Sequence, residues 1–333
     1  MKYFVTGATG FIGGRVARRL LADGHTVTIL ARDPAKAGDL AALGASVHQG
    51  DITDRSRLRA PMAGADGVFH IAAWYKIGAR DSTPAAAINV EGTRNVLETM
   101  KELGIPKGVY TSTLAVNDDT RGVLVDETYR AARSSLSEYS RTKWIAHYEV
   151  AEPMMRAGLP LIVAVSGLVY GPGDTSAAGA TLEQYLTRRL PLTPQRTAFC
   201  WAHVDDVAHA HVLAMDKGRA GESYIIAGPV HTLVDALALA ERITGIPAPR
   251  WHPGPAAMRV MGQVMSLVGA VVPLPETFTG EMLRGMAGAT YIGSNAKARR
   301  DLGYDPRTLE AGLRETLASD MERLGLRTPA AAR

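Results

Sequence analysis

Short apolar runs alternate with longer amphipathic segments through the first half of the chain. Six runs rich in aliphatic and β-branched residues are predicted as strands: residues 2–6, 26–31, 46–49, 67–71, 108–112 and 161–165. Between them, residues 12–22, 85–103 and 137–157 carry apolar positions at helical spacing. Strands that alternate with helices are typical of βαβ units, in which the strands run parallel. The pattern therefore predicts the α/β class, with a doubly wound parallel sheet.

The second half of the chain follows this rhythm less closely. Residues 171–173, 175–179 and 191–194 are predicted as loops, and a helix over 206–217 and a strand over 222–227 then resume the alternation. Residues 232–323 are predicted as mostly helical. We therefore expect a sheet domain of residues 1–165 with a return segment at 203–228. A smaller, mostly helical domain would contain residues 166–202 and 229–333.

Composition narrows the classes of protein that fit this chain. Of its 333 residues, 46% are hydrophobic and 21% charged, which is typical of a folded globular protein. The 37 Lys and Arg residues nearly balance the 33 Asp and Glu residues, and no run of five like charges marks a nucleic-acid-binding surface. The single cysteine, Cys200, cannot form a disulfide within the chain. We expect a protein of the reducing cytoplasm that binds no nucleic acid.

One segment tests whether the chain meets a membrane. Residues 256–274 are mostly apolar and about as long as a bilayer span, but Arg259, Gln263, Ser266 and two glycines interrupt them. Prolines flank the segment on both sides. These features predict a buried helix or a hydrophobic lid without stable membrane insertion, and contact with a membrane surface is the alternative.

Three glycines mark the turn between the first strand and the first helix. Gly7, Gly10 and Gly13 suit, in that order, a tight turn, the close approach of backbone to a pyrophosphate, and close packing of helix on strand. Phe11 and Ile12 begin the helix, whose free N–H groups and positive dipole end favour phosphate. The turn predicts a dinucleotide-binding site at the start of the sheet domain.

Tyr139 and Lys143 lie four residues apart in the predicted helix 137–157, so both face one side. After hydride transfer to a carbonyl, a phenol can supply the proton that the alkoxide needs, if its pKa of about 10 is lowered. A nearby ammonium group favours phenolate and lowers that pKa. The pair predicts an acid–base tyrosine assisted by a lysine.

Further motifs follow the glycine turn along the chain. They are Gly50-Asp51-Ile52, His70-Ile71-Ala72-Ala73, Asn89-Val90-Glu91-Gly92-Thr93, Val169-Tyr170-Gly171-Pro172-Gly173-Asp174, His203-Val204-Asp205-Asp206-Val207-Ala208 and Leu302-Gly303-Tyr304. With these motifs the chain resembles the extended short-chain dehydrogenases/reductases, the NAD(P)-dependent epimerase/dehydratase type, over nearly its whole length. It is most similar to dihydroflavonol-4-reductase-like and hopanoid-associated sugar epimerase-like proteins.

The resemblance implies roles for residues beyond the glycine turn. It implies the dinucleotide-binding (Rossmann) character of residues 1–165 and a substrate-binding role for the smaller domain. The implied cofactor contacts are Asp51 and Ile52 at the adenine, Ala72 and Ala73 at the adenosine, Leu168 and Val169 at the nicotinamide, and Tyr139 and Lys143 at the nicotinamide ribose. The hydroxyl that polarises the carbonyl falls at Thr113, with Ser112 as the alternative.

A homodimer is also implied by the resemblance. Its interface would use the helices near residues 89–103 and 137–157. The apolar residues expected on these faces are Val90, Val96, Leu97, Trp144 and Ile145.

The end of the second strand bears on the choice of cofactor. An acidic residue there would bind the ribose hydroxyls of NAD(H) and repel the 2′-phosphate of NADP(H). Here the strand ends in Ala31 and Arg32, with Lys36 one turn further on, and a guanidinium suits a phosphate. NADP(H) is favoured, while Asp33 keeps NAD(H) open.

Substrate contacts are expected outside the carboxyl ends of the strands, where such sheets bind ligands. Trp74 and Tyr75 follow the fourth strand, and Tyr185 and Trp201 are weaker candidates from the smaller domain. Packing within the protein is the alternative role for these aromatic residues. No metal site is expected around His203, because His209 and His211 point in different directions on one helix and Asp205 suits a helix cap.

Three functions remain open from the sequence. The first is an NADPH-dependent carbonyl reductase with Thr113, Tyr139 and Lys143 as its catalytic residues. The second is an NAD-dependent sugar-nucleotide epimerase or dehydratase. In such relatives an Arg-Asp pair precedes the histidine that corresponds to His203, but Phe199 and Cys200 stand there in this chain. The third is a non-catalytic NADP-binding sensor, which would not need Tyr139.

Overall fold

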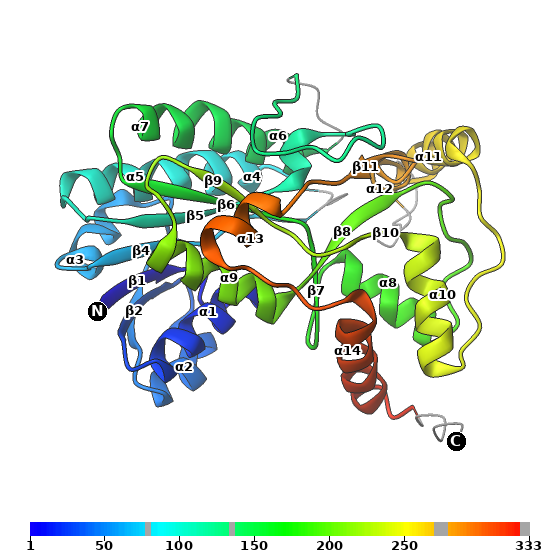
Figure 1. The fold of residues 1–333 in the computed structure, drawn as a ribbon, viewed down its shortest axis with the longest axis horizontal. Helices are drawn as coiled ribbons and strands as arrows, with labels where there is room; N and C mark the ends of the chain where they lie inside the picture. Colours follow the sequence, from blue (N-terminus) through cyan, green and yellow to red (C-terminus); the bar gives the residue numbers. More distant parts are fainter. Residues whose placement is uncertain (77–80, 133–136, 270–278, 327–333) are drawn as a thin grey trace.

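A seven-stranded parallel sheet forms the centre of the molecule, in the order β3-β2-β1-β4-β5-β6-β9 (Figure 1). The computed structural model describes residues 1–76, 81–132, 137–269 and 279–326. The strands of this sheet are β1 (Lys2–Thr6), β2 (Thr26–Ala31), β3 (Ser46–Gln49), β4 (Gly67–His70), β5 (Gly108–Thr113), β6 (Leu161–Ser166) and β9 (Ser223–Ile226). All neighbouring pairs run parallel. The predicted doubly wound parallel sheet is confirmed.

Helices cover both faces of the sheet because its strands bury side chains on both sides. One face packs against α1 (Phe11–Ala22) and α9 (Val204–Lys217), where Val5 and Val16 share a core. The other face packs against α5 (Gly92–Glu102) and the helical run α6 (Glu138–Ile145), η5 (Ala146–Ala151) and α7 (Glu152–Arg156). Short elements complete this part of the chain: η1 (Pro34–Ala37), α2 (Gly38–Ala42), η2 (Arg55–Arg57), α3 (Arg59–Met62), α4 (Pro84–Ala86), η3 (Ala87–Glu91) and η4 (Leu114–Asn117).

The helices expected at a dimer interface differ from the prediction. Each contains a π-helical segment, η3 or η5, instead of a regular α-helix throughout. Val90, Val96 and Leu97 are buried against the sheet of their own chain. Their assignment to an exposed interface was wrong, because helical spacing identifies an apolar face but not the surface that covers it. Trp144 and Ile145 are partly buried, and the homodimer itself stays a prediction.

A second, smaller sheet lies beside the first, toward the right of Figure 1. It contains β7 (Leu168–Tyr170), β8 (Ala198–His203), β10 (Val230–Thr232) and β11 (Thr290–Tyr291). Around it lie α8 (Ala177–Leu186), α10 (Leu233–Thr244), α11 (Pro255–Gly269), α12 (Gly280–Gly285) and α14 (Leu309–Arg323). The helix α13 (Ala296–Leu302) packs instead on α9 and β9 of the large sheet. The loop predicted at 175–179 was partly wrong, because Ser176 caps α8 from Ala177 onward. The division into two domains stays a prediction.

The apolar segment predicted at 256–274 forms α11 in its described part, and residues 270–274 lie outside the described residues. Across the described ranges, no helix combines the length and the hydropathy that a membrane crossing requires.

Three buried histidines join the sheet to its helices through hydrogen bonds. The ring of His70 contacts Thr6 at 2.8 Å and Thr93 at 3.0 Å, and the His147 ring lies 2.8 Å from the Ser112 hydroxyl. His211 links the Thr111 hydroxyl, at 2.7 Å, to its own helix. Burial lowers the pKa of His70 and of His147 to about 3 and that of His211 to about 4. All three are therefore neutral in the folded protein at neutral pH.

We expect these histidines to make the fold sensitive to acid. Below an unfolded-state pKa of about 6.5, the unfolded chain takes up protons that the folded chain cannot, so stability is lost as pH falls toward 4. Each histidine contributes a slope of up to about 1.4 kcal/mol per pH unit. Urea unfolding of the wild type and of His147→Gln across this pH range measures how much His147 contributes to the pH dependence of the free energy of unfolding. The exposed His252 provides the control His252→Gln, and an unchanged slope in His147→Gln would contradict the assignment.

Candidate active site

The glycine turn lies where the sheet order reverses, between the carboxyl ends of β1 and β4. Gly7 has a φ of +74°, and a Cβ atom there would lie 2.6 Å from the backbone nitrogen of Ala72. A Cβ on Gly13 would lie 2.2 Å from the Gly7 carbonyl oxygen, and one on Gly10 would lie 3.2 Å from it. Side chains at Gly7 and Gly13 would therefore collide with neighbouring backbone, whereas Gly10 lies on the exposed side of the turn.

The first turn of α1 offers its N–H groups to a ligand. Gly10 is the N-cap residue, no side chain caps the helix, and no acidic residue stands in its first turn. Phe11 and Ile12 begin the helix and are partly buried. Unpaired N–H groups and the positive end of the helix dipole together suit a pyrophosphate.

The side of the site next to β2 carries two exposed basic residues, Arg32 and Lys36. Asp33 does not pair with them, because its carboxylate accepts the Ala35 N–H at 3.1 Å as the cap of η1. Within the described residues, Arg32 forms no ion pair, so its guanidinium can bind a phosphate. Beyond β3, the Asp51 carboxylate accepts hydrogen bonds from the Thr53 N–H and hydroxyl. Ile52 is buried beside it.

The chain after β4 is held in place from two sides. Thr6 accepts hydrogen bonds from the Ile71 and Ala72 N–H groups, each at 3.2 Å, and Ala73 follows, partly buried. On the other side, the Asn89 amide donates to the Trp74 carbonyl at 2.9 Å and accepts the Trp74 N–H at 2.7 Å. The same amide donates to Thr142, on the helix between Tyr139 and Lys143. Asn89 thus fixes the backbone of Trp74 relative to α6.

The Tyr139 phenol lies beside the Thr113 hydroxyl at the carboxyl end of β5, close enough for the hydroxyl to affect its pKa. Tyr139 lies in the first turn of α6, which begins with a capping box between Ser137 and Ser140. Burial raises the pKa of Tyr139 above its usual value, and the neighbouring Thr113 hydroxyl only partly opposes this. The phenol is therefore protonated at neutral pH, the form that can donate a proton.

Lys143 lies one turn further along α6 and is buried. Its ammonium donates to the Thr111 carbonyl at 2.7 Å and to the Tyr110 hydroxyl at 3.0 Å. Burial lowers the pKa of Lys143 to about 7, so its charge changes near neutral pH. The expectation that Lys143 lowers the pKa of Tyr139 is not met, since the ammonium bonds to β5 and burial controls the phenol.

Tyr110 is a contact of Lys143 that the sequence did not indicate. It lies three residues before Thr113 in a strand where every residue is buried, so no spacing rule distinguishes it. Its ring stacks on His70 at a centroid distance of 5.5 Å. His70 bonds to Thr6 in turn, so a chain of buried polar groups connects Lys143 with the glycine turn.

The structure separates the two hydroxyl candidates on β5. Ser112 points toward η5, where its hydroxyl forms a hydrogen bond with the His147 ring. Its backbone carbonyl accepts a hydrogen bond from Ser166 at 3.1 Å. Thr113, at the strand end, contacts Tyr139 and also accepts the Ala115 N–H at 3.2 Å. Thr113 is therefore the hydroxyl that shares a location with the candidate acid.

The remaining predicted residues divide into two groups. Leu168 and Val169 lie on β7, partly buried, and Tyr75 is 51% exposed. Tyr185 and Trp201 are core residues, each about 2% exposed. The Tyr185 hydroxyl bonds to Thr244 and to the Ile246 carbonyl, and the Trp201 indole donates to the His231 carbonyl. Their polar atoms are thus used inside the protein, and we do not propose them as substrate contacts.

One group of possible metal ligands occurs among the described residues: His203, Asp205 and Glu315. The Asp205 carboxylate pairs with Arg15 at 2.8 Å, and the Glu315 carboxylate pairs with Arg307 at 2.7 Å. Each carboxylate already has a cationic partner, so the group gives no support to a metal site.

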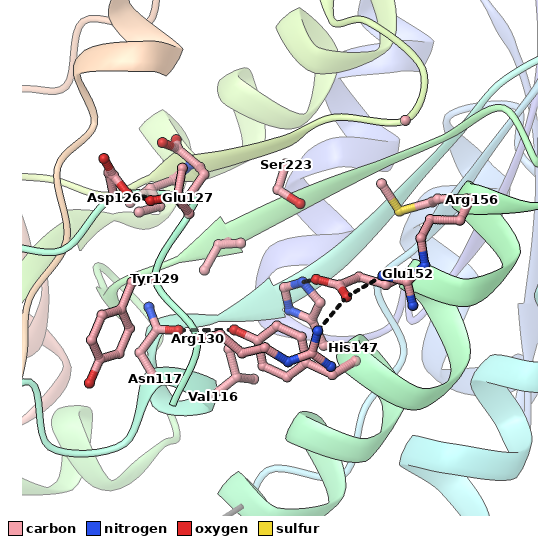
Figure 2. Close-up of a pocket in the computed structure, with 16 residues that line it drawn as sticks. Val116, Asn117, Asp126, Glu127, Tyr129, Arg130, His147, Glu152, Arg156 and Ser223 are labelled. Carbon is pink, nitrogen blue, oxygen red and sulfur yellow. Dashed lines mark hydrogen bonds and ion pairs between the residues drawn. The ribbon is translucent and has the colours of Figure 1, made fainter. Parts of the chain in front are cut away.

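A cavity of about 410 Å³, shown in Figure 2, is lined by residues of η5, α7, β6 and β9 and of the segment 126–130. His147 lines it, whereas Thr113, Tyr139 and Lys143 do not. Three of its charged groups pair with one another: Glu152 accepts from Arg130 and from Arg156, each at 3.2 Å. The cavity is therefore separate from the groups gathered at the ends of β1, β4 and β5.

Comparisons with known proteins agree with this geometry. The sequence model of the NAD dependent epimerase/dehydratase family matches residues 3–227. A putative dihydroflavonol 4-reductase of Synechocystis sp. is 32% identical over 74% of each chain. Sterol demethylase protein B of Methylococcus capsulatus is 29% identical over 97% of this chain and 99% of its own. The crystal structure of gox2253 superposes with a TM-score of 0.84 at 29% identity, covering 98% of this chain and 99% of that one. The chain belongs to the NAD dependent epimerase/dehydratase family, the extended short-chain dehydrogenases/reductases, and is an NAD(P)-dependent oxidoreductase of that type.

Proposed function

We propose that the protein is an NADPH-dependent reductase of a carbonyl compound, an aldehyde or a ketone, and that it also catalyses the reverse oxidation. The observation that carries this proposal is the placement of the Tyr139 phenol beside the Thr113 hydroxyl at the end of β5, one helical turn from the buried Lys143. Ligands of such sheets bind outside the carboxyl ends of the strands. A carbonyl oxygen at that place would meet both hydroxyl groups.

Each residue of the site has a separate role in the proposed reaction. Bound NADPH would supply the hydride that reduces the carbonyl carbon. Thr113 donates a hydrogen bond to the carbonyl oxygen, and Tyr139 gives its phenolic proton to the alkoxide that forms. Lys143 would hold the nicotinamide ribose, and its pKa near 7 means that its positive charge is lost above neutral pH. Asn89 holds Thr142 and the Trp74 backbone, which keeps the substrate side of the site attached to α6.

The surroundings favour an apolar substrate over a sugar nucleotide. Sugar-nucleotide diphosphates need a basic clamp, and Phe199 and Cys200 stand at the positions where the family resemblance implies it. The Phe199 ring stacks on Tyr291 at 5.6 Å, and Cys200 is fully buried. The similar protein from Methylococcus capsulatus is named for a sterol, which is also apolar. We therefore propose a lipophilic carbonyl compound as substrate.

We expect Tyr139→Phe to lower kcat for carbonyl reduction about a thousandfold, because the alkoxide loses its proton donor. NADPH affinity, measured by fluorescence titration, should change little. Oxidation of NADPH, followed by absorbance against a panel of aldehydes, ketones and flavanone-like carbonyls, measures the rate. A wild-type protein that releases tightly bound NAD and oxidises no NADPH would instead indicate an epimerase or dehydratase.

Variants of the β5 hydroxyls test the role of Thr113. Thr113→Ala should lower kcat about a hundredfold, and Thr113→Ser should restore most of it, since serine keeps the donor. The neighbouring Ser112→Ala provides the matched control, because that hydroxyl bonds to His147. A larger loss of kcat in Ser112→Ala than in Thr113→Ala would contradict the assignment.

We further propose that Arg32 gives the preference for NADPH by binding its 2′-phosphate. Arg32→Ala should raise the Kd for NADPH at least about tenfold, because a charged hydrogen bond to phosphate is lost. The Kd for NADH should stay unchanged, and the exposed Arg19→Ala is the control for charge alone. Equal weakening of both cofactors in Arg32→Ala would contradict this role.

The glycine turn gives a test of cofactor binding without turnover. Gly13→Ala should raise the Kd for NADPH about tenfold or more and destabilise the fold by about 1–3 kcal/mol, since its Cβ would collide with the Gly7 carbonyl. Gly38→Ala is the matched control, because its φ is −59° and no atom lies within 4 Å of the added Cβ. Isothermal titration and thermal unfolding measure the two effects.

A further inference from the structure

The outward face of α11 is apolar. Val260, Val264, Leu267 and Val268 are 59%, 52%, 75% and 38% exposed, and their spacing places them in one stripe along the helix. Exposed Ala256 and Ala257 extend this stripe toward the start of the helix. We call these six residues the α11 stripe. An exposed apolar strip of this kind marks a contact surface.

The inward face of α11 is already covered by the protein. Met258 packs with Leu192 and Leu283, and Gly262 allows close contact with α12, since a Cβ there would lie 3.2 Å from the Gly280 carbonyl. The α11 stripe is therefore not required to hold the helix in the fold. Its side chains are available to something outside this chain.

Charge indicates what that partner is. No Asp or Glu occurs from residue 242 to residue 275, whereas this stretch contains three arginines and a histidine. Arg259 is exposed at one edge of the stripe. Arg284 reaches the same edge from α12, where it donates to the Ser266 hydroxyl at 2.6 Å. Trp251, just before the helix, is 55% exposed. An apolar stripe edged by arginines, with an exposed tryptophan at one end, is complementary to the surface of an anionic lipid bilayer. There apolar side chains contact the acyl chains and arginines contact the phosphates.

We propose that α11 docks flat on an anionic lipid surface, with its stripe in the outer part of the acyl region and its arginines at the phosphates. In its described part α11 has 15 residues, fewer than a bilayer crossing needs, so we propose that it lies on the membrane rather than through it. A second copy of this chain fits less well. Pairing stripe against stripe about a twofold axis would bring the arginines of both copies together, and this stretch has no carboxylate to neutralise them.

The docking surface is one helix away from the candidate active site. α11 packs on α12, and Glu281 of α12 accepts the Glu138 N–H at 3.1 Å, next to Tyr139 (Figure 1). If the proposed reductase function holds, this arrangement brings the site close to carbonyl compounds dissolved in the membrane. The docking itself does not depend on that function.

Flotation of the full-length protein with vesicles tests the proposal. We expect binding to vesicles of phosphatidylcholine mixed with phosphatidylglycerol, and binding at least about tenfold weaker to phosphatidylcholine alone or at high salt. Val264→Glu with Leu267→Glu should abolish binding, and Arg259→Gln should weaken it selectively on the anionic vesicles. Leu43→Glu is the matched control, because Leu43 is 56% exposed and lies after α2 in the sheet domain.

Two further measurements keep the outcomes distinct. NADPH titration and thermal unfolding establish that each variant is folded, so loss of vesicle binding with both unchanged supports docking, whatever the reaction proves to be. Absence of wild-type binding to the anionic vesicles, or binding equal in the double variant, overturns the proposal. Light scattering that shows a wild-type dimer and a monomeric Leu267→Glu variant would assign the stripe to a second copy and also overturn it.

Discussion

The close contact between the glycine turn and the chain after β4 is the constraint on which the rest of this site depends. Gly7 can approach Ala72 because neither residue places a large side chain between the two backbones. The Thr6 hydroxyl oxygen also accepts hydrogen bonds from the Ile71 and Ala72 N–H groups, which begin this segment. Where the strand order reverses, between β1 and β4, the surface therefore consists of backbone atoms. A phosphate can come closer to this surface than it could if side chains covered it.

Burial governs the chemistry of the residues at the end of β5. It raises the pKa of Tyr139 and lowers that of Lys143 to about 7, so at neutral pH the phenol is protonated and the lysine is poised to change its charge. The Thr111 carbonyl and the Tyr110 hydroxyl partly compensate the buried ammonium. His70, His147 and His211 behave alike, since each is neutral and forms a hydrogen bond with a hydroxyl group inside the protein.

The smaller sheet and the helices around it could be predicted only in outline. β11 has two residues and β7 has three, and both pair with β8, whose partners are far away in the sequence. Such short strands carry too few positions for a period to be recognised. Trp201 on β8 and Tyr185 on α8 show the same limit, because an aromatic residue has no sequence feature that separates a pocket wall from a core position.

The sequence alone determined the features that follow from local geometry. It indicated the order of strands and helices, the glycine turn and the one-turn spacing of Tyr139 and Lys143, because backbone periodicity and the size of glycine operate over a few residues. Only the tertiary structure decided which hydroxyl meets Tyr139, that Tyr110 contacts Lys143, that Val96 and Leu97 face inward, and that the α11 stripe faces outward. Those outcomes depend on which surfaces meet across long stretches of chain, and an apolar pattern identifies a face without identifying its partner.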